Sequence, residues 1–367
     1  MKHFCSVISP IAAPRTEKYG AKGPYSAASF PSVPAELVNG LVHAANHAVT
    51  KNTHSSYKTA LKLWNQCARE SRFDSNLPCS EQNTLIYVAW LIKRGVRAST
   101  IEVYLSGIRA AHLESGLNPP NIRTDRIKLI LSGKSHEDCQ KKQTGELTTR
   151  LPITPNMLKL FKAELSNSNM SYSDTRMIWA VACMLFFGGF RPGELLCRNS
   201  LSFDPHNALL GKDIKMKTVK VNNLETETMQ VYLVTEKADS SGNGKIVDIY
   251  SSASTLCPIQ AFKKFRDQAK IEEKKPVFRL QNGKNFTTKM LNEKLKQYLG
   301  KHVDTDCKRV TGHSFRIGIA SLVAQLGYSE EQIKSLGRWS SEAYLKYLRL
   351  PRTRREEMAR ELQNFTI

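Results

Sequence analysis

The chain of 367 residues carries 54 lysine and arginine residues against 33 aspartate and glutamate residues, a formal net charge of +21. Such an excess of positive charge marks a surface that binds polyanions, and nucleic acid is the natural partner. With 41% hydrophobic residues, the chain also has enough apolar material for two folded domains.

Cysteine spacing and apolar runs exclude several classes of protein. The eight cysteines show neither a C-x-x-C pair nor a Cys/His ligand spacing, so we predict reduced thiols, no disulfides and no metal site. The longest apolar run, residues 177–187, has eleven residues and is too short to cross a bilayer. We therefore expect no membrane association.

The first part of the chain is predicted to be an arm followed by a helical domain. Residues 1–34 are rich in Pro, Ser, Ala and Gly, lack a hydrophobic period and show no cleaved signal, which predicts a disordered arm. Residues 35–132 have apolar residues three to four positions apart, which is typical of helices. We predict helices at 35–47, 53–71, 81–93 and 99–116, with Thr53 and Ser99 as N-caps. Four or five helices would form this small all-α domain.

A polar linker is predicted to separate this domain from a second one. Residues 133–150 are polar and charged and have no apolar period, whereas residues 151–350 mix helical and strand patterns. We predict helices at 151–166, 173–187, 258–269, 287–299 and 313–326, and three strands within 201–250. Ser329 and Gln332 are spaced as the capping box of one more helix. The predicted fold class is α+β, with a small antiparallel sheet in the second domain.

Lysines crowd one short segment of the predicted strand region. Residues 207–221 carry Lys212, Lys215, Lys217 and Lys220. These side chains either contact a phosphate backbone or solvate an edge strand.

Three strings in the second domain carry side chains suited to phosphate chemistry: GGFRPGEL at residues 188–195, GHSFR at 312–316 and LGRWSSEAYLKYLR at 336–349. Arg191 and Arg316 supply planar guanidinium groups that can each hold two phosphate oxygens. His313 precedes Arg316 by three residues, so on a helix both would share one face. Together the strings predict a cluster that binds one phosphate.

The third string adds a donor and two tyrosines. Trp339 can donate a hydrogen bond through its indole N–H. A tyrosine with an ordinary pKa of about 10 attacks phosphorus only if its proton is removed or its oxyanion is stabilised, as a cationic cluster does. Tyr347 is the preferred nucleophile and Tyr344, three residues earlier, is its rival. The residues thus predict a phosphodiester-cleaving site built on tyrosine.

These strings resemble the signature of the tyrosine recombinases, or phage integrase family. That signature has an arginine in a G-x-R-x-x-E/D-L turn, an H-x-x-R, a His or Trp, and a C-terminal Tyr; the sequence matches it from about residue 35 to residue 350, most strongly after residue 180. The strings HSFRIGIAS and LGRWSSEAYLKYLR look most like the recombinases of eukaryotic Crypton and DIRS elements. One departure is the spacing of eight residues from Trp339 to Tyr347, where the family usually has nine.

The resemblance also implies a lysine on a β-hairpin that protonates the leaving 5′ oxygen. The run MQVYLVTEKADSSGNGKIVDIY predicts two strands, 229–236 and 245–250, joined by a Gly/Ser/Asn turn. Lys237 matches the family's position, and Lys245 across the turn is the alternative, as a lysine that only contacts phosphate. Glu194 either steadies the site's His and Arg side chains, as in the family, or acts as a carboxylate at a helix N-terminus.

From the resemblance we expect a recombinase or transposase of a mobile element. It would cut and rejoin double-stranded DNA through a 3′-phosphotyrosyl intermediate, with no ATP, metal ion or other cofactor, as a tetramer on DNA. Localisation in the nucleus follows if the substrate is chromosomal DNA. Residues 351–367 would form a C-terminal helix that docks on a neighbouring subunit or packs on its own domain.

Two other readings stay open from the sequence. A type IB topoisomerase uses similar chemistry on one duplex as a monomer. A domesticated, inactive recombinase would act only as a DNA-binding protein, although every expected catalytic position is filled in this chain.

Overall fold

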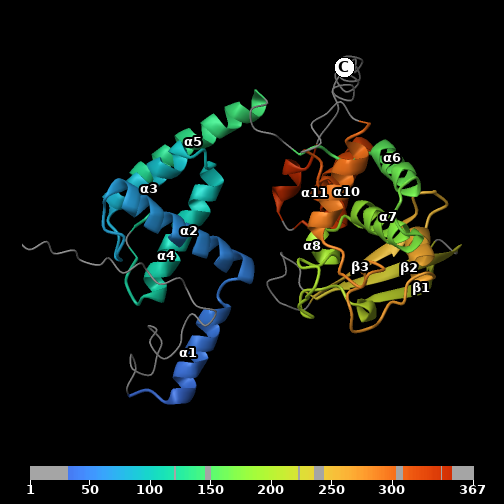
Figure 1. Cartoon of the computed structure of the whole chain (residues 1–367), viewed down its shortest axis with the longest axis horizontal. Coiled ribbons are helices and arrows are strands. Elements are labelled where there is room, and N and C mark those ends of the chain that lie inside the picture. The colour runs from blue at the N-terminus through green and yellow to red at the C-terminus, as the bar shows by residue number, and fades with distance from the viewer. Residues whose placement is uncertain are drawn as a thin grey trace, which may run out of the picture. The chain divides into compact units, whose positions relative to one another are not determined.

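The structure is a computed structural model that describes residues 32–119, 121–144, 150–221, 224–234, 244–302, 309–339 and 341–348. The chain forms two compact units, Met1–Thr148 and Thr149–Ile367 (Figure 1). Almost all of the predicted arm, the predicted C-terminal helix and Lys237 lie outside the described residues. Among the residues that are described, no helix has the length and apolar character needed to span a membrane.

The described part of the first unit is all-α, as predicted. Its helices are α1 (Ala35–His47), α2 (Lys51–Ser71), α3 (Glu81–Lys93), α4 (Ala98–Glu114) and α5 (Asp125–Gln143). Helix α2 packs along α4. Gly107 of α4 permits this close approach, because a Cβ there would lie 3.0 Å from both Cα of Tyr57 and Cβ of Ala60.

The core of the first unit joins aromatic rings to backbone carbonyls. Trp64 and Tyr87 are fully buried, with ring centroids 5.3 Å apart in an edge-to-face arrangement. The indole of Trp64 donates to the carbonyl of Ser75 at 2.9 Å, and the hydroxyl of Tyr87 donates to that of Ala60 at 2.9 Å. Each large apolar ring is therefore buried without leaving its polar atom unpaired.

Both predicted N-caps of the first unit were wrong. Helix α2 starts two residues earlier than predicted, and the side chain of Thr50 accepts from the amide of Thr53 at 3.3 Å. Helix α4 starts at Ala98, whose amide donates to Asp138 of α5 at 2.9 Å instead of to a local cap. The sequence around Ser99 carries no signal of that distant carboxylate, so a local capping rule misassigned the helix start.

The prediction of a linker over residues 133–150 was wrong for its first part, because α5 runs to Gln143. Ion pairs at helical spacing replace the missing apolar period. Lys134 has a side chain only 5% exposed and lies 2.8 Å from Asp138 and 3.0 Å from Glu137. The two units divide between residues 148 and 149, next to residues 145–149 that are not described.

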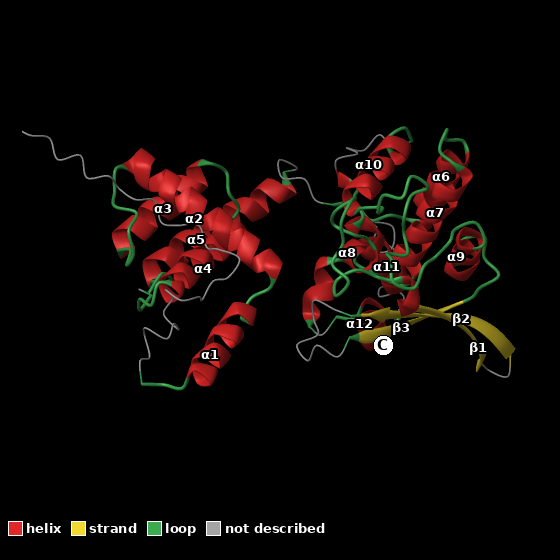
Figure 2. Ribbon diagram, turned by 60° about the horizontal axis from the view of Figure 1, so that its bottom comes forward, coloured by secondary structure: helices red, strands yellow, loops and turns green. Residues whose placement is uncertain are grey.

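The second unit mixes helices with a small antiparallel sheet, as predicted. The strands β1 (Ile214–Val221), β2 (Leu224–Leu233) and β3 (Lys245–Tyr250) lie in the order β1-β2-β3. The helices are α6 (Pro155–Ser166), α7 (Tyr172–Phe187), α8 (Pro192–Leu195), α9 (Pro258–Arg266), α10 (Thr288–Leu299), α11 (His313–Gln325) and α12 (Glu330–Gly337), with 3₁₀ turns η2 (Gly211–Asp213) and η4 (Glu342–Lys346). Met229 of β2 pairs with Met216 of β1 and Ile249 of β3. Helix α9 packs against β2 and β3, and Figure 2 shows the sheet at one side of this unit's helices.

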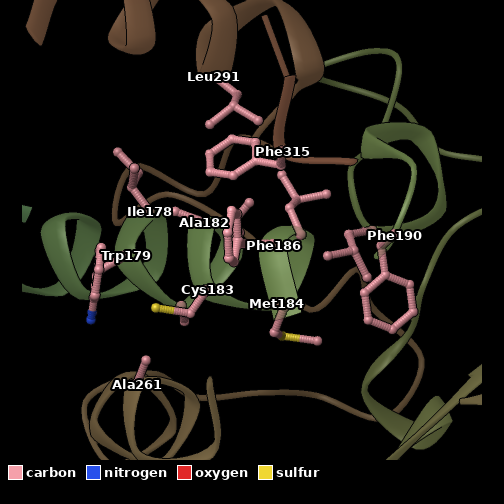
Figure 3. Packing of buried hydrophobic residues seen from close by; sticks show 14 of the residues in the cluster. Ile178, Trp179, Ala182, Cys183, Met184, Phe186, Phe190, Ala261, Leu291 and Phe315 are labelled. Carbon is pink, nitrogen blue, oxygen red and sulfur yellow. The ribbon is translucent and has the colours of Figure 1, made fainter. Parts of the chain in front are cut away.

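Helix α7 is the centre of the second unit. Every residue from Met177 to Phe186 is buried, as expected for a helix that is apolar all round. Figure 3 shows Phe186 on the side of Phe315 of α11 and Cys183 on the side of Ala261 of α9. The helix ends at Gly188, so its burial fixes the start of the GGFRPGEL turn.

The charged network of α5 yields a stability prediction. Replacing Asp138 by Asn should destabilise the first unit by about 1–3 kcal/mol, because the buried ammonium of Lys134 loses its closest carboxylate. Asp125→Asn is the matched control, since its pair with Lys128 has a carboxylate side chain that is 98% exposed, and it should cost about 1 kcal/mol or less. Hydrogen exchange of α4 and α5 amides in urea measures both. Equal losses in the two variants would contradict the prediction.

Candidate active site

The first and second strings meet through direct backbone packing. Helix α11 begins at His313 after Gly312, whose amide donates to the side chain of Asn292 at 2.7 Å. A Cβ on Gly312 would lie only 2.7 Å from the ring of Pro192, the residue after Arg191. Glycine at this position therefore allows the GHSFR string to lie against the GGFRPGEL turn.

Arg316 joins all three strings from inside the protein. Its side chain is fully buried, and its two terminal nitrogens donate to the carbonyls of Gly189 and Gly337. Burial, followed by the positive charges of Arg191 and Arg338, lowers the pKa of Arg316 to about 10, so the group remains charged at neutral pH. The ring of Trp339 lies over this guanidinium, with its centroid 4.5 Å from Cζ.

Arg191 is held by the carboxylate that follows it one turn later. The backbone amide of Arg191 donates to Oε2 of Glu194 at 2.9 Å, and its Nη1 lies 2.6 Å from Oε1. The side chain of Glu194 is 6% exposed and that of Arg191 is 23% exposed. Glu194 thus fits both readings left open by the sequence: it caps the short helix α8 and orients an arginine.

Arg338 is a site residue that the sequence reasoning missed. It ends α12 in the left-handed conformation, and its side chain, 3% exposed, pairs with Glu194 at 2.8 Å. One signal could have found it: Arg338 precedes Tyr347 by nine residues, which is the spacing that the tyrosine recombinase signature gives to its His or Trp. Trp339, the residue assigned to that position, precedes Tyr347 by eight.

Tyr347 lies against His313 and Trp339. Its hydroxyl forms a hydrogen bond of 3.1 Å with Nε2 of His313, and its ring lies 5.4 Å from that of Trp339. The backbone carbonyl of Tyr347 accepts from the hydroxyl of Ser321 at 3.1 Å, which anchors the segment to α11. An imidazole at this distance can receive the phenol proton when the oxygen attacks an electrophile.

Trp339 lies between the guanidinium of Arg316 and the ring of Tyr347. It is 9% exposed, and a Cβ on Gly337 would overlap its ring at 1.8 Å, so the residue before Arg338 must be glycine for the ring to lie there. The ring therefore covers Arg316 on one side and contacts Tyr347 on the other.

Tyr344 has a different environment from Tyr347. It is buried, and its hydrogen bond with the Glu330 carboxylate raises the pKa of its hydroxyl to about 12. Tyr344 lies in the 3₁₀ turn η4, and Tyr347 follows this turn, with its amide donating to the carbonyl of Tyr344 at 2.8 Å. The hydroxyl of Tyr347 thus meets an imidazole, whereas that of Tyr344 meets a carboxylate that opposes its ionisation.

The lysines proposed for DNA contact are exposed where they are described. Lys212 lies in η2, Lys215, Lys217 and Lys220 lie on β1, an edge strand of the sheet, and Lys245 starts β3. Lys237, the preferred general acid, lies outside the described residues. The roles of all these lysines remain predictions.

Comparison by sequence finds no relative: no protein-family model and no curated protein matches this chain. Comparison of the fold does find similar structures. The XerH site-specific recombinase in its post-cleavage complex with palindromic difH substrate has a TM-score of 0.55, at 12% identity, over 91% of this chain and 86% of that chain. A variant of the Tn1549 transposon integrase in complex with transposon right end DNA has a TM-score of 0.53, at 16% identity, over 86% and 95%.

The chain has a tyrosine recombinase-like fold. Identities of this size support the architecture and leave the residue roles to the geometry described above. The predicted fold class, an all-α unit followed by a mixed unit with a small antiparallel sheet, is confirmed.

The hydrogen bond between Tyr344 and Glu330 can be tested by titration of Tyr344. Glu330→Gln should lower the pKa of Tyr344 from about 12 toward the ordinary value of about 10, because the neutral amide no longer disfavours the phenolate. Glu331→Gln is the matched control, since Glu331 acts on Tyr344 only as a more distant charge, and its effect should be smaller. Carbon-13 NMR of protein labelled at tyrosine Cζ measures the shift. An unchanged pKa in Glu330→Gln would show that the hydrogen bond is absent in solution.

Proposed function

We propose that this protein is a DNA strand transferase of the tyrosine recombinase type, which cuts and rejoins double-stranded DNA through a covalent phosphotyrosyl intermediate. The observation that carries the proposal is the hydrogen bond of 3.1 Å between Tyr347 and His313 beside a cluster of guanidinium groups. A phenol oxygen next to an imidazole and several fixed positive charges suits attack on a phosphodiester.

In the first step, the hydroxyl oxygen of Tyr347 forms a bond to phosphorus while the bond from phosphorus to the 5′ oxygen breaks. His313 is within reach to take the phenol proton, and Lys237 supplies a proton to the leaving 5′ oxygen. The product is a 3′-phosphotyrosyl link and a 5′ hydroxyl. A 5′ hydroxyl of a partner duplex reverses the step and restores Tyr347.

The arginines contribute in different ways. Arg191 is partly exposed and offers its guanidinium to a phosphate that approaches from solvent. Arg316 is fully buried, and its terminal nitrogens donate to backbone carbonyls. It therefore contributes its positive charge at a distance, from the buried side of the Trp339 ring. Positive charge fixed in advance stabilises the extra negative charge of the pentacoordinate transition state.

A mobile element is the proposed source of the DNA substrate. The strings HSFRIGIAS and LGRWSSEAYLKYLR resemble Crypton and DIRS recombinases, and one structural neighbour is the integrase of a transposon in complex with its end DNA. The net charge of +21 and the exposed lysines of β1 support binding to a duplex. Assembly as a tetramer on DNA and localisation in the nucleus are parts of this proposal.

Covalent capture tests the reaction without knowledge of the target. The full chain is incubated with nicked duplexes that contain a randomised segment, and complexes that resist denaturing detergent are recovered and sequenced. We expect wild-type protein and Tyr344→Phe to capture DNA and Tyr347→Phe to capture none, because only Tyr347 forms the phosphotyrosyl bond. Loss of capture in Tyr344→Phe alone would make Tyr344 the nucleophile. DNA binding without capture by the wild-type protein would identify an inactive DNA-binding protein.

The leaving group tests the lysine assignment. A captured sequence is synthesised with sulfur in place of the bridging 5′ oxygen, since a thiolate leaves without needing a proton. We expect Lys237→Ala to slow cleavage of the normal duplex by about 100-fold or more and to regain near wild-type rates on the sulfur substrate. Lys245→Ala should affect both duplexes alike. Selective rescue of Lys245→Ala would move the general acid to that residue.

A further inference from the structure

The side chain of Arg338 is hydrogen-bonded to both ends of the turn that carries Arg191. Its Nη1 donates to the carbonyl of Gly188 at 2.9 Å, and its Nη2 donates to the carbonyl of Gly189 at 3.3 Å and to Oε2 of Glu194 at 2.8 Å. Its guanidinium lies 4.9 Å from the ring centroid of Phe190. One buried side chain at the end of α12 thus links Gly188 and Gly189 at the start of the turn to Glu194 at its end.

The backbone of Arg338 has a conformation that residues other than glycine rarely adopt. With φ of 54°, the residue occupies the left-handed position at a helix end where glycine is favoured. Arg72 has the same φ of 54° at the end of α2, but its side chain is exposed. The unusual backbone of Arg338 is therefore combined with burial and bonding that the similar helix end at Arg72 lacks.

Glu194 is shared between two arginines. Its Oε1 holds Nη1 of Arg191, whereas its Oε2 holds both the amide of Arg191 and Nη2 of Arg338. Rotation of the carboxylate would break the bond to Arg338, so Arg338 fixes the plane in which Glu194 presents Oε1. That plane sets the direction of the Arg191 guanidinium. Of the two arginines that pair with Glu194, Arg191 is the more exposed.

Arg338 also connects this turn to the segment of Tyr347. It is followed directly by Trp339, whose ring contacts Tyr347 at 5.4 Å, and it shares the carbonyl of Gly189 with Arg316. Arg338 therefore contacts the Arg191 turn through its side chain and is joined through its backbone to Trp339, which contacts Tyr347.

We propose that Arg338 is a positioning residue of the reaction, which orients Arg191 through Glu194 and aligns the Arg191 turn with the Tyr347 segment. The assignment rests on the proposed function, and it gives an arginine at the signature's His or Trp spacing a role through Glu194. Arg338 acts through Glu194 and the two glycine carbonyls and need not touch the phosphate itself.

The test compares Arg338→Gln, Arg338→Lys and Arg338→Ala with the wild-type full chain on a captured duplex. At saturating DNA, the rate of covalent adduct formation should fall about 30-fold or more in Arg338→Gln, with DNA affinity within about threefold of wild type. Arg338→Lys keeps one charge but cannot bridge a carbonyl and a carboxylate, so its rate should be intermediate. Arg279→Gln is the matched control: it breaks an arginine pair with Glu272 in the same unit and should leave the rate unchanged.

Two further measurements separate positioning from a loss of folding. Guanidinium ion at non-denaturing concentration should restore part of the activity of Arg338→Ala, whereas the same concentration of sodium chloride should not. Combining Arg338→Gln with Glu194→Gln should slow the reaction little more than the more damaging of the two single substitutions, because both remove the same bond between Arg338 and Glu194.

The outcomes distinguish this inference from the proposed function. Wild-type rates in Arg338→Gln, or additive effects with Glu194→Gln and no guanidinium rescue, would overturn the role of Arg338 while adduct formation by the wild-type protein would still support the function. An absence of adduct from the wild-type protein would remove both.

Discussion

The burial of the Arg316 guanidinium is the constraint on which the rest of the site depends. A fully buried positive charge costs several kcal/mol unless hydrogen-bond acceptors surround it. Its acceptors here are the carbonyls of Gly189 and Gly337, from the turn after α7 and the end of α12. Two segments far apart in the sequence must therefore meet at α11 before this charge can be buried, and the site forms only when the second unit has folded.

Charge balance in this cluster favours an anion. The guanidinium groups of Arg191 and Arg338 lower the pKa of Arg316, whereas Glu194 and Tyr347 act in the opposite direction. Three guanidinium groups thus share one carboxylate, and the charges of Arg191 and Arg338 disfavour the ionised form of Arg316. A phosphate diester would relieve that repulsion, which is a physical reason for the cluster to bind an anion. The apolar packing around α7, which is buried from Met177 to Phe186, offsets the cost of this repulsion.

Local patterns predicted most of the fold because their causes are local. The apolar run of residues 177–187 identified a buried helix, and alternation identified β3 with its correct bounds. The linker and the Ser99 cap were wrong because the stabilising partners are charged groups, such as the distant carboxylate of Asp138 for Ala98, whereas the Thr53 cap was wrong because the nearby Thr50 caps α2 instead. Arg338 was missed because its partners are also distant: they lie about 150 residues earlier in the chain. Because the signature's His or Trp position was assigned to Trp339, the neighbouring Arg338 was not considered.

The sequence motif leaves two candidates for the nucleophile, Tyr344 and Tyr347, and the partners of their hydroxyls distinguish them. Tyr344 and Tyr347 are only three residues apart, and both lie near Trp339, with ring centroids at 6.3 Å and 5.4 Å. Their hydroxyls differ in partner: a carboxylate raises the pKa of Tyr344, whereas an imidazole that can accept a proton faces Tyr347. A nucleophilic phenol must lose its proton at the moment of attack. Tyr347 has a proton acceptor within hydrogen-bond distance, whereas the carboxylate beside Tyr344 opposes ionisation of Tyr344 and bonds that tyrosine to α12.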